Sequence, residues 1–330
     1  MRDHLMVVFV LSALFLLAGV AAAEEETAII AEPVGEEAFH ALAQFFDYDR
    51  GVPLDARIVG KKKTELYVRE KIVFSGTDGE RVPGYLVIPV QGSGPYPIVL
   101  LLHGFTDSKE GWWKDDSYGK GGLVSKGLLE KGFSVLTLDA RKHGERLWRN
   151  DFESPWKMIE EGRWVDYRDL LIDTVIDYRR ALDYLSRRSD IDISRVGVLG
   201  YSSGGTMTMQ LAAVDDRIRV VTVCVASAYG YSSLKSLHKD LTAPEIRSRL
   251  LSLSVRTQAI SEQNYAEAIG SRAFLLIVGS RDSWYSVAEA RMFLDLIPGP
   301  TKEIQVYDSG HRLPKEYAAR ATEWFRKHLK

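Results

Sequence analysis

Residues Ser194–Gly205, with the sequence SRVGVLGYSSGG, decide the fold of this chain. The apolar run Arg195–Leu199 predicts a buried strand, and Thr206–Ala213 has the composition of a helix. The pentapeptide GYSSG between them matches G-x-S-x-G and predicts a nucleophile elbow, in which Ser202 occupies a strained turn. Small residues are needed two positions before and after Ser202, because backbone passes close by. The alternative is an ordinary glycine turn between a strand and a helix.

Composition limits the class of protein. The chain has 330 residues, 45% hydrophobic and 27% charged, which is typical of one large globular α/β domain with insertions or of two smaller domains. The formal net charge of −2 gives no electrostatic reason to expect a nucleic acid or an anionic membrane surface as partner. Cys224 is the only cysteine, so no disulfide can form within the chain, and its apolar surroundings predict a buried packing residue.

Residues 1–23 have the organisation of a signal peptide. Arg2 supplies positive charge, Leu5–Val20 is almost entirely apolar, and Ala21–Ala23 offers small residues for cleavage. We therefore expect export to the periplasm or the cell exterior, with a mature chain that begins near Glu24 and has no stable membrane association. The alternative is an uncleaved membrane anchor, because the apolar stretch is nearly long enough to span a bilayer.

The rest of the chain predicts an N-terminal extension, residues 24–64, followed by one domain, residues 65–330. The extension should contain one helix, Glu36–Phe46, and the domain should open with an antiparallel hairpin of strands Glu65–Phe74 and Arg81–Val90. Continuous apolar runs then alternate with helical segments, which predicts a mainly parallel sheet with helices on both faces. These elements are the strand Tyr96–Leu102, the helix Leu123–Lys131, the strand Phe133–Leu138, the helix Tyr167–Ser186, the strand before Ser202, the strands Val220–Ala226 and Phe274–Val278, the helix Val287–Leu296, the strand Glu303–Tyr307 and the helix Tyr317–Leu329.

Two stretches are longer than ordinary connections between such elements. Residues 141–166 lie between a strand and the following helix, and residues 229–271 separate two strands. Both are candidates for an insertion that caps the site.

Ser202 would need a base and an orienting acid to act as a nucleophile. In an open α/β sheet the working residues lie beyond the carboxyl ends of the strands, and Asp282 and His311 follow the last two predicted strands. Their chain order, Ser, Asp, His, is the one associated with this elbow. A neutral His311 would accept the Ser202 proton, while Asp282 would fix the imidazole tautomer. The alternative for each residue alone is a structural role, Asp282 as a turn residue and His311 as a loop histidine. If Asp282 is not the acid, Asp139 and Asp308 are the next candidates.

An oxyanion hole should be formed by two backbone N–H groups. Ser203, directly after the nucleophile, is expected to provide one, and the loop after the first parallel strand the other. In that loop we assign the donor to Phe105, because Gly104 permits a close approach, and we expect His103 to hold the loop by hydrogen bonds.

No metal and no cofactor is expected. His103, His143 and His311 fall on different loops, and the sequence has no H-E-x-x-H motif and no cysteine pair. The glycine-rich GYSSGG lacks the lysine of a phosphate-binding loop.

Tryptophans are concentrated in the loops and insertions expected near the site. An aromatic rim would suit an acyl chain, an aromatic acid or the face of a sugar. The alternative is that these rings pin the insertions to the core. We predict that four of these tryptophans line the substrate pocket: Trp112, Trp113, Trp148 and Trp284. The other two are Trp156 and Trp164.

Several motifs resemble one known superfamily. GYSSG, HGFTDS, GSRD and SGHRLP are similar to motifs of the α/β-hydrolase fold superfamily, and LDARKHGER and PGYLVIP resemble its dienelactone-hydrolase-like and acetyl-xylan-esterase-like branch. The resemblance covers roughly residues 65–329 and implies an α/β-hydrolase fold with Ser202, Asp282 and His311 as nucleophile, acid and base. Dienelactone hydrolases use a cysteine nucleophile, so the serine at this position favours a serine esterase over lactone hydrolysis.

Together these observations predict an exported serine carboxylesterase that acts through an acyl-enzyme on a small-molecule or polysaccharide-linked ester. One alternative is a serine peptidase of the prolyl-oligopeptidase type, disfavoured by the short stretch before the hairpin. The other is a catalytically silent hydrolase fold that serves as a binding module. No oligomeric state follows from the sequence.

Overall fold

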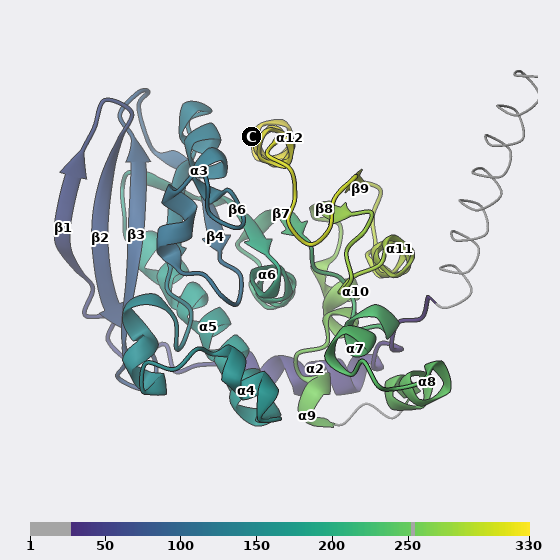
Figure 1. Ribbon diagram of the computed structural model, residues 1–330. Coiled ribbons are helices and arrows are strands. Elements are labelled where there is room, and N and C mark those ends of the chain that lie inside the picture. The colour runs from purple at the N-terminus through teal and green to yellow at the C-terminus, as the bar shows by residue number, and fades with distance from the viewer. Residues whose placement is uncertain (1–27, 252–254) are drawn as a thin grey trace, which may run out of the picture.

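The computed structural model describes residues 28–251 and 255–330, so the predicted signal peptide lies outside the described residues. Within them, nine strands form one sheet in the order β1-β2-β3-β5-β4-β6-β7-β8-β9 (Figure 1). The strands are β1 (Arg57–Lys63), β2 (Tyr67–Ser75), β3 (Arg81–Pro89), β4 (Tyr96–Leu102), β5 (Ser134–Leu138), β6 (Ile191–Tyr201), β7 (Ile218–Cys224), β8 (Ala273–Gly279) and β9 (Lys302–Tyr307).

The sheet combines an antiparallel and a parallel part. β1 pairs antiparallel with β2, β2 with β3 and β3 with β5, whereas β5, β4, β6, β7, β8 and β9 are parallel. The predicted hairpin and mainly parallel sheet are therefore confirmed. β1 was not predicted: its lysine-rich sequence, RIVGKKK, is mostly exposed and lacks a buried face, which suits an edge strand that discourages pairing with other chains.

Helices cover both faces of the sheet, and the side chains of each parallel strand alternate between them. In β4, Ile98, Leu100 and Leu102 join the core formed with α5 and α6, whereas Val99 and Leu101 join the core formed with α3 and α12. This two-sided burial explains why the predicted strands were continuous apolar runs. The helices are α2 (Glu36–Ala43), α3 (Gly121–Glu130), α4 (Trp156–Glu160), α5 (Trp164–Leu185), α6 (Ser203–Val214), α7 (Tyr231–Leu237), α8 (Ala243–Leu251), α9 (Val255–Gln258), α10 (Ala266–Ile269), α11 (Val287–Leu296) and α12 (Glu316–His328), with the 3-10 helices η1 (Gln44–Phe46), η2 (Lys109–Trp113), η3 (Gly144–Asn150) and η4 (Glu262–Tyr265).

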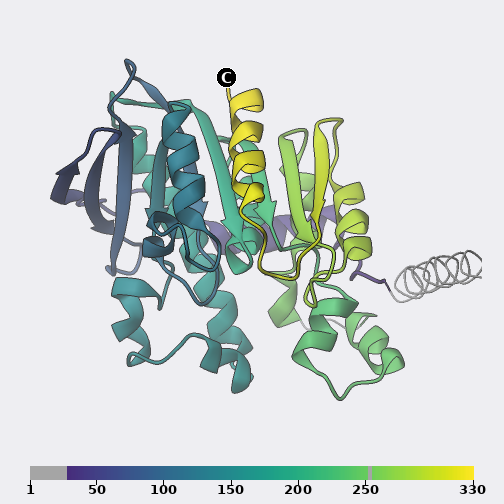
Figure 2. The same cartoon turned by 45° about the horizontal axis from the view of Figure 1, so that its top comes forward.

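The two long connections are helical insertions at one end of the sheet. Residues 141–166 contain η3, α4 and the first turn of α5, and residues 229–271 contain α7, α8, α9, η4 and α10. Figure 2 shows them as two lobes, one formed by α4 with the start of α5 and the other by α7 and α8, on the same side of the sheet. Both insertions contribute walls to the cavity described below.

The N-terminal extension packs against the second insertion. Ile30 forms a β-bridge with Gly230, and the Ala31 N–H donates to the Tyr229 carbonyl at 3.1 Å. The Phe39 and Phe46 rings contact Tyr265 edge to face, with centroid distances of 5.9 and 5.7 Å. The extension therefore braces the insertion that closes the site.

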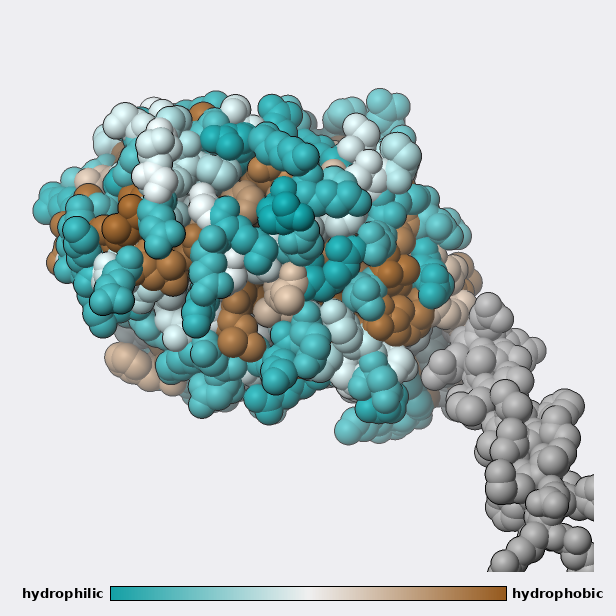
Figure 3. Space-filling model, turned by 90° about the horizontal axis from the view of Figure 1, so that it is seen from above, coloured by the Kyte–Doolittle hydropathy of each residue, from teal (hydrophilic) through white to brown (hydrophobic). Residues whose placement is uncertain are grey.

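Seen from above, the surface is mostly hydrophilic, and hydrophobic side chains form separate patches (Figure 3). Among the described residues, no helix is both long and apolar enough to cross a membrane.

Candidate active site

The turn after β6 holds Ser202 in a strained conformation. Ser202 has φ 55° and ψ −122°, a backbone region that residues with side chains rarely adopt. A Cβ at Gly200 would overlap the Gly204 backbone, and a Cβ at Gly204 would overlap the Leu102 carbonyl oxygen. Glycine at both positions therefore lets β6, β4 and α6 come together around the serine, as an elbow requires.

Ser202, His311 and Asp282 form one chain of hydrogen bonds. The Ser202 Oγ lies 2.9 Å from His311 Nε2, and His311 Nδ1 lies 2.9 Å from Asp282 Oδ2. The Asp282 side chain is fully buried, whereas that of His311 is 20% exposed. The structure thus brings together the three residues that the sequence singled out, in the order that would pass a proton from the serine to the imidazole.

Neighbouring groups fix the acid and the base. The backbone N–H of Trp284 donates to Asp282 Oδ1 at 2.9 Å, which leaves Asp282 Oδ2 for the histidine. The Tyr201 hydroxyl donates to the His311 carbonyl at 2.9 Å and accepts from the Leu313 N–H at 3.0 Å, so the residue before Ser202 holds the loop that carries His311. The Tyr285 ring stacks on the His311 imidazole, with 6.3 Å between the ring centroids.

The other two candidate acids are committed elsewhere. Asp139 is fully buried and pairs with Lys109 Nζ at 2.7 Å, and it also accepts the Lys109 and Glu145 backbone N–H groups. Asp308 is exposed and forms an ion pair with Arg281. Neither has the bond to His311 that Asp282 makes.

The loop after β4 lies against the elbow. A Cβ on Gly104 would lie 3.4 Å from the Tyr201 carbonyl oxygen and 3.7 Å from Ser202 Cβ. Phe105 and Ser203 both line the cavity, and neither backbone N–H donates to a carbonyl of the described part of the chain. Both donors are therefore available to a ligand at Ser202.

Two buried histidines hold this loop. His103 Nδ1 lies 2.8 Å from the Gly104 carbonyl, and His103 Nε2 accepts the Ala140 N–H at 3.0 Å, as expected of a shape-holding residue. His143 Nε2 lies 2.7 Å from the Phe105 carbonyl. Burial lowers the pKa of His103 and lowers that of His143 to about 4.

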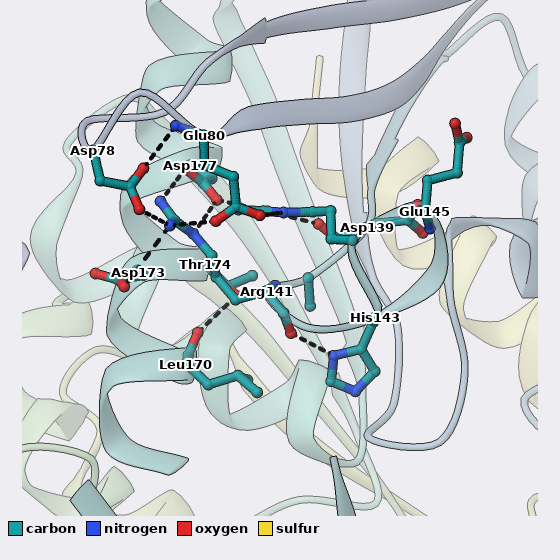
Figure 4. A network of polar contacts seen from close by, with 12 residues as sticks. Asp78, Glu80, Asp139, Arg141, His143, Glu145, Leu170, Asp173, Thr174 and Asp177 are labelled. Carbon is teal, nitrogen blue, oxygen red and sulfur yellow. Dashed lines mark hydrogen bonds and ion pairs between the residues drawn. The ribbon is translucent and has the colours of Figure 1, made fainter. Parts of the chain in front are cut away.

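A buried ionic network supports the segment that carries His143. Figure 4 shows Asp78, Glu80 and Asp177 around Arg141, with Asp173 at the edge of the cluster. Arg141 donates to Asp177 at 2.9 and 3.1 Å, to Glu80 at 2.9 Å and to Asp78 at 2.6 Å. The network joins the turn between β2 and β3, the start of the first insertion and α5.

Arg146 is the second cation of the network. It donates to Glu80 at 2.8 Å, to Asp177 at 2.8 Å and to the Asp139 carbonyl at 3.0 Å, and it is only 1% exposed. These bonds fix LDARKHGER as a rigid support behind the loop of Phe105.

A cavity of about 340 Å³ lies in front of the serine, between the carboxyl ends of the strands and the two insertions. Of the four predicted pocket tryptophans, Trp112 and Trp284 line it and Trp113 and Trp148 do not. Trp113 instead packs against Tyr67 and Tyr85 of the antiparallel strands, and Trp148 is 52% exposed on η3. The larger aromatic wall comes from other residues: Phe105, Tyr118, Trp156, Trp164, Tyr167, Tyr229 and Tyr285.

Glu262 is an acidic wall residue that the sequence analysis did not single out. It is 5% exposed, lines the cavity and accepts the Thr206 hydroxyl at 2.7 Å. Burial raises the pKa of its carboxyl to about 7. The second insertion contains four acidic residues, and no local pattern in the sequence distinguishes Glu262 from a surface glutamate.

Among residues 28–251 and 255–330, no group of histidine, cysteine, aspartate and glutamate side chains has the arrangement of a metal site. Cys224 is buried, and desolvation raises the pKa of its thiol, in keeping with a packing role.

Comparison with known proteins extends these observations. The profile of the alpha/beta hydrolase family matches residues 99–286. The chain is 30% identical over 177 residues to the putative hydrolase YtaP of Bacillus subtilis (strain 168), a match that covers 52% of this chain and 58% of YtaP. It is 24% identical over 248 residues to the putative esterase YitV of the same organism, covering 71% of this chain and 89% of YitV.

A similar fold is found among solved structures. The crystal structure of acetyl xylan esterase 1 from Thermoanaerobacterium sp. JW/SL YS485 superimposes with a TM-score of 0.67 at 20% sequence identity, covering 92% of this chain and 98% of that chain. At this identity the likeness concerns the fold.

Proposed function

Because the chain belongs to the alpha/beta hydrolase family, we propose that it is a serine carboxylesterase that cleaves carboxylic esters through an acyl-enzyme. The observation that carries the proposal is the continuous hydrogen bonding from Ser202 Oγ through His311 to Asp282, at 2.9 Å in each step. The apolar cavity in front of the serine and the esterase among the relatives support an ester as substrate.

In the proposed first half-reaction Ser202 Oγ attacks the ester carbonyl carbon while His311 Nε2 takes the hydroxyl proton. The N–H groups of Phe105 and Ser203 stabilise the oxyanion of the tetrahedral intermediate, and buried Asp282 stabilises the imidazolium. His311 then gives the proton to the departing alkoxide, and the alcohol leaves. In the second half-reaction water attacks the acyl-enzyme with His311 again as base, which releases the acid and restores Ser202.

The cavity supports a small-molecule ester or an ester group carried on a polysaccharide. Its wall is largely aromatic, and about 340 Å³ accommodates an acyl group or one sugar-sized moiety, while a longer chain would extend into solvent.

Labelling with a fluorophosphonate tests the nucleophile. The unaltered protein should react covalently and hydrolyse aryl esters of rising acyl length, whereas Ser202→Ala should do neither and keep its fold by circular dichroism. Acetylated xylan, feruloyl esters and peptide amides in the same panel define the substrate class. Labelling that persists in Ser202→Ala, or amide cleavage faster than ester cleavage, would contradict the proposal.

We also propose that the protein is exported, on the strength of the signal-peptide organisation of residues 1–23. N-terminal sequencing of the protein from its native host should find a mature chain beginning near Glu24. An intact Met1 in the membrane fraction would show that the segment remains as an anchor.

A further inference from the structure

Glu262 lies in the cavity wall one helical turn beyond the nucleophile. Its carboxylate accepts the Thr206 hydroxyl at 2.7 Å, and the Thr206 N–H donates to the Ser202 carbonyl at 3.2 Å across the first turn of α6. Four residues of helix advance by about 6 Å. The carboxyl group therefore lies within the length of a small substrate bound at the serine.

Within the described part of the chain, this carboxyl group has no cationic partner. Its charge instead acts on phenols from four separate elements: Tyr167 of α5, Tyr229 after β7, Tyr265 of η4 and Tyr285 after β8. Burial raises the pKa of every one of these phenols, so all four are uncharged near neutral pH. An ionised carboxylate buried among neutral groups is costly, and the elevated pKa of Glu262, about 7, expresses that cost.

The rest of the wall offers aromatic faces and edges. Trp156 and Trp284 meet edge to face at 6.0 Å, and Tyr167 contacts Phe105 at 5.4 Å. All four rings line the same cavity as Glu262. Aromatic rings combined with a buried carboxylate form a site for a weakly hydrated cation, because the ring faces attract positive charge and the carboxylate neutralises it.

We propose that the cavity binds esters that carry an ammonium group, with the aromatic wall around the cation and Glu262 as its counter-ion. The inference rests on the proposed esterase function and names the class of its substrate. A bound cation supplies the partner that Glu262 lacks and recovers the cost of burying its charge. The Thr206 hydroxyl holds the carboxylate in place at the cavity wall.

The pH dependence of cation binding follows from the same groups. The ammonium group prefers the ionised form of Glu262, so its affinity should increase as the pH rises through about 7 and then level off. The four phenols remain neutral over this range. His311, which stacks on Tyr285, is present in both the unaltered protein and Glu262→Gln. Comparison with Glu262→Gln isolates the part that belongs to Glu262.

Two isosteric esters test the proposal directly. Acetylcholine carries a quaternary ammonium group, and neohexyl acetate has carbon in place of the nitrogen. We expect kcat/KM to favour acetylcholine by about 10- to 100-fold at pH 8. In Glu262→Gln this ratio should fall toward one, whereas in the matched control Glu267→Gln, an exposed residue of α10, it should be retained. A ratio near one in the unaltered protein, or an unchanged ratio in Glu262→Gln, would overturn the proposal.

A binding measurement separates this inference from the esterase function. Calorimetric titration of Ser202→Ala with choline and with its neutral isostere neohexanol requires no turnover. Tighter binding of choline, strengthening between pH 6 and pH 8, supports the cation site even if no ester is hydrolysed. Equal binding of the two alcohols refutes the cation site even if fluorophosphonate labels Ser202 and neutral esters are cleaved. Should Glu262→Gln fail to fold, the choline and neohexanol comparison alone decides the matter.

Discussion

Arg146→Met should destabilise the protein strongly, although Arg146 is remote from the reacting atoms. Arg146 is 1% exposed and compensates two buried carboxylates, Glu80 and Asp177, at 2.8 Å each. Methionine preserves most of the volume and removes the charge. Within the described residues, Arg141 is then the one buried cation left to those carboxylates.

The expected size follows from the burial of this network. Removing one partner of a buried ion pair costs about 3–5 kcal/mol, because the charge left behind stays desolvated and uncompensated. At roughly 2 °C per kcal/mol for a domain of this size, a loss of about 4 kcal/mol lowers the melting temperature by roughly 8 °C. Arg146→Lys should reduce the free energy of unfolding by less, because the positive charge is kept and only the planar guanidinium group with its paired donors is lost.

Urea unfolding, monitored by circular dichroism, measures the difference in the free energy of unfolding between each variant and the unaltered protein. The matched control is Arg281→Met, which removes the arginine of an exposed pair with Asp308 and should leave the midpoint nearly unchanged. If Arg146→Met lowers the free energy of unfolding by less than about 1 kcal/mol, or Arg281→Met lowers it equally, the buried network does not support the fold.

Three further predictions concern the elbow and the hydrogen-bonded chain. Asp282→Asn should lower kcat on the order of 10⁴-fold with the fold retained, because the amide no longer holds the His311 tautomer; a loss below about tenfold in an aryl-ester assay would assign the acid elsewhere. Gly204→Ala should abolish activity and fluorophosphonate labelling, because the new Cβ would overlap the Leu102 carbonyl oxygen; labelling at the normal rate would contradict this. Turnover of a neutral ester should fall in acid and should be unaffected by EDTA, because the proposed mechanism uses Ser202 as nucleophile and His311 as its base. A pH–rate profile that peaks near pH 4–5, or activity lost to EDTA and restored by zinc, would refute this prediction.

Much of the architecture followed from local sequence. The central parallel strands were visible as apolar runs because both of their faces are buried, and the elbow was visible because strand, glycine turn and helix are adjacent in the chain. The positions of Asp282 and His311 followed from topology, since carboxyl ends of parallel strands meet at one edge of the sheet. β1 was missed because a polar edge strand has no apolar face to reveal it.

The wall of the cavity was decided by the tertiary structure alone. Trp112 and Trp113 are neighbours in sequence, yet one lines the cavity and the other packs on the antiparallel strands. Glu262 reaches the cavity only because the second insertion folds back against α6. Local periodicity reports contacts between near neighbours in the chain, whereas the direction of a side chain in an irregular insertion depends on packing against residues far away in sequence. For that reason the sequence by itself determined the candidate catalytic residues and the sheet that presents them, and the tertiary structure determined the wall of the cavity around them.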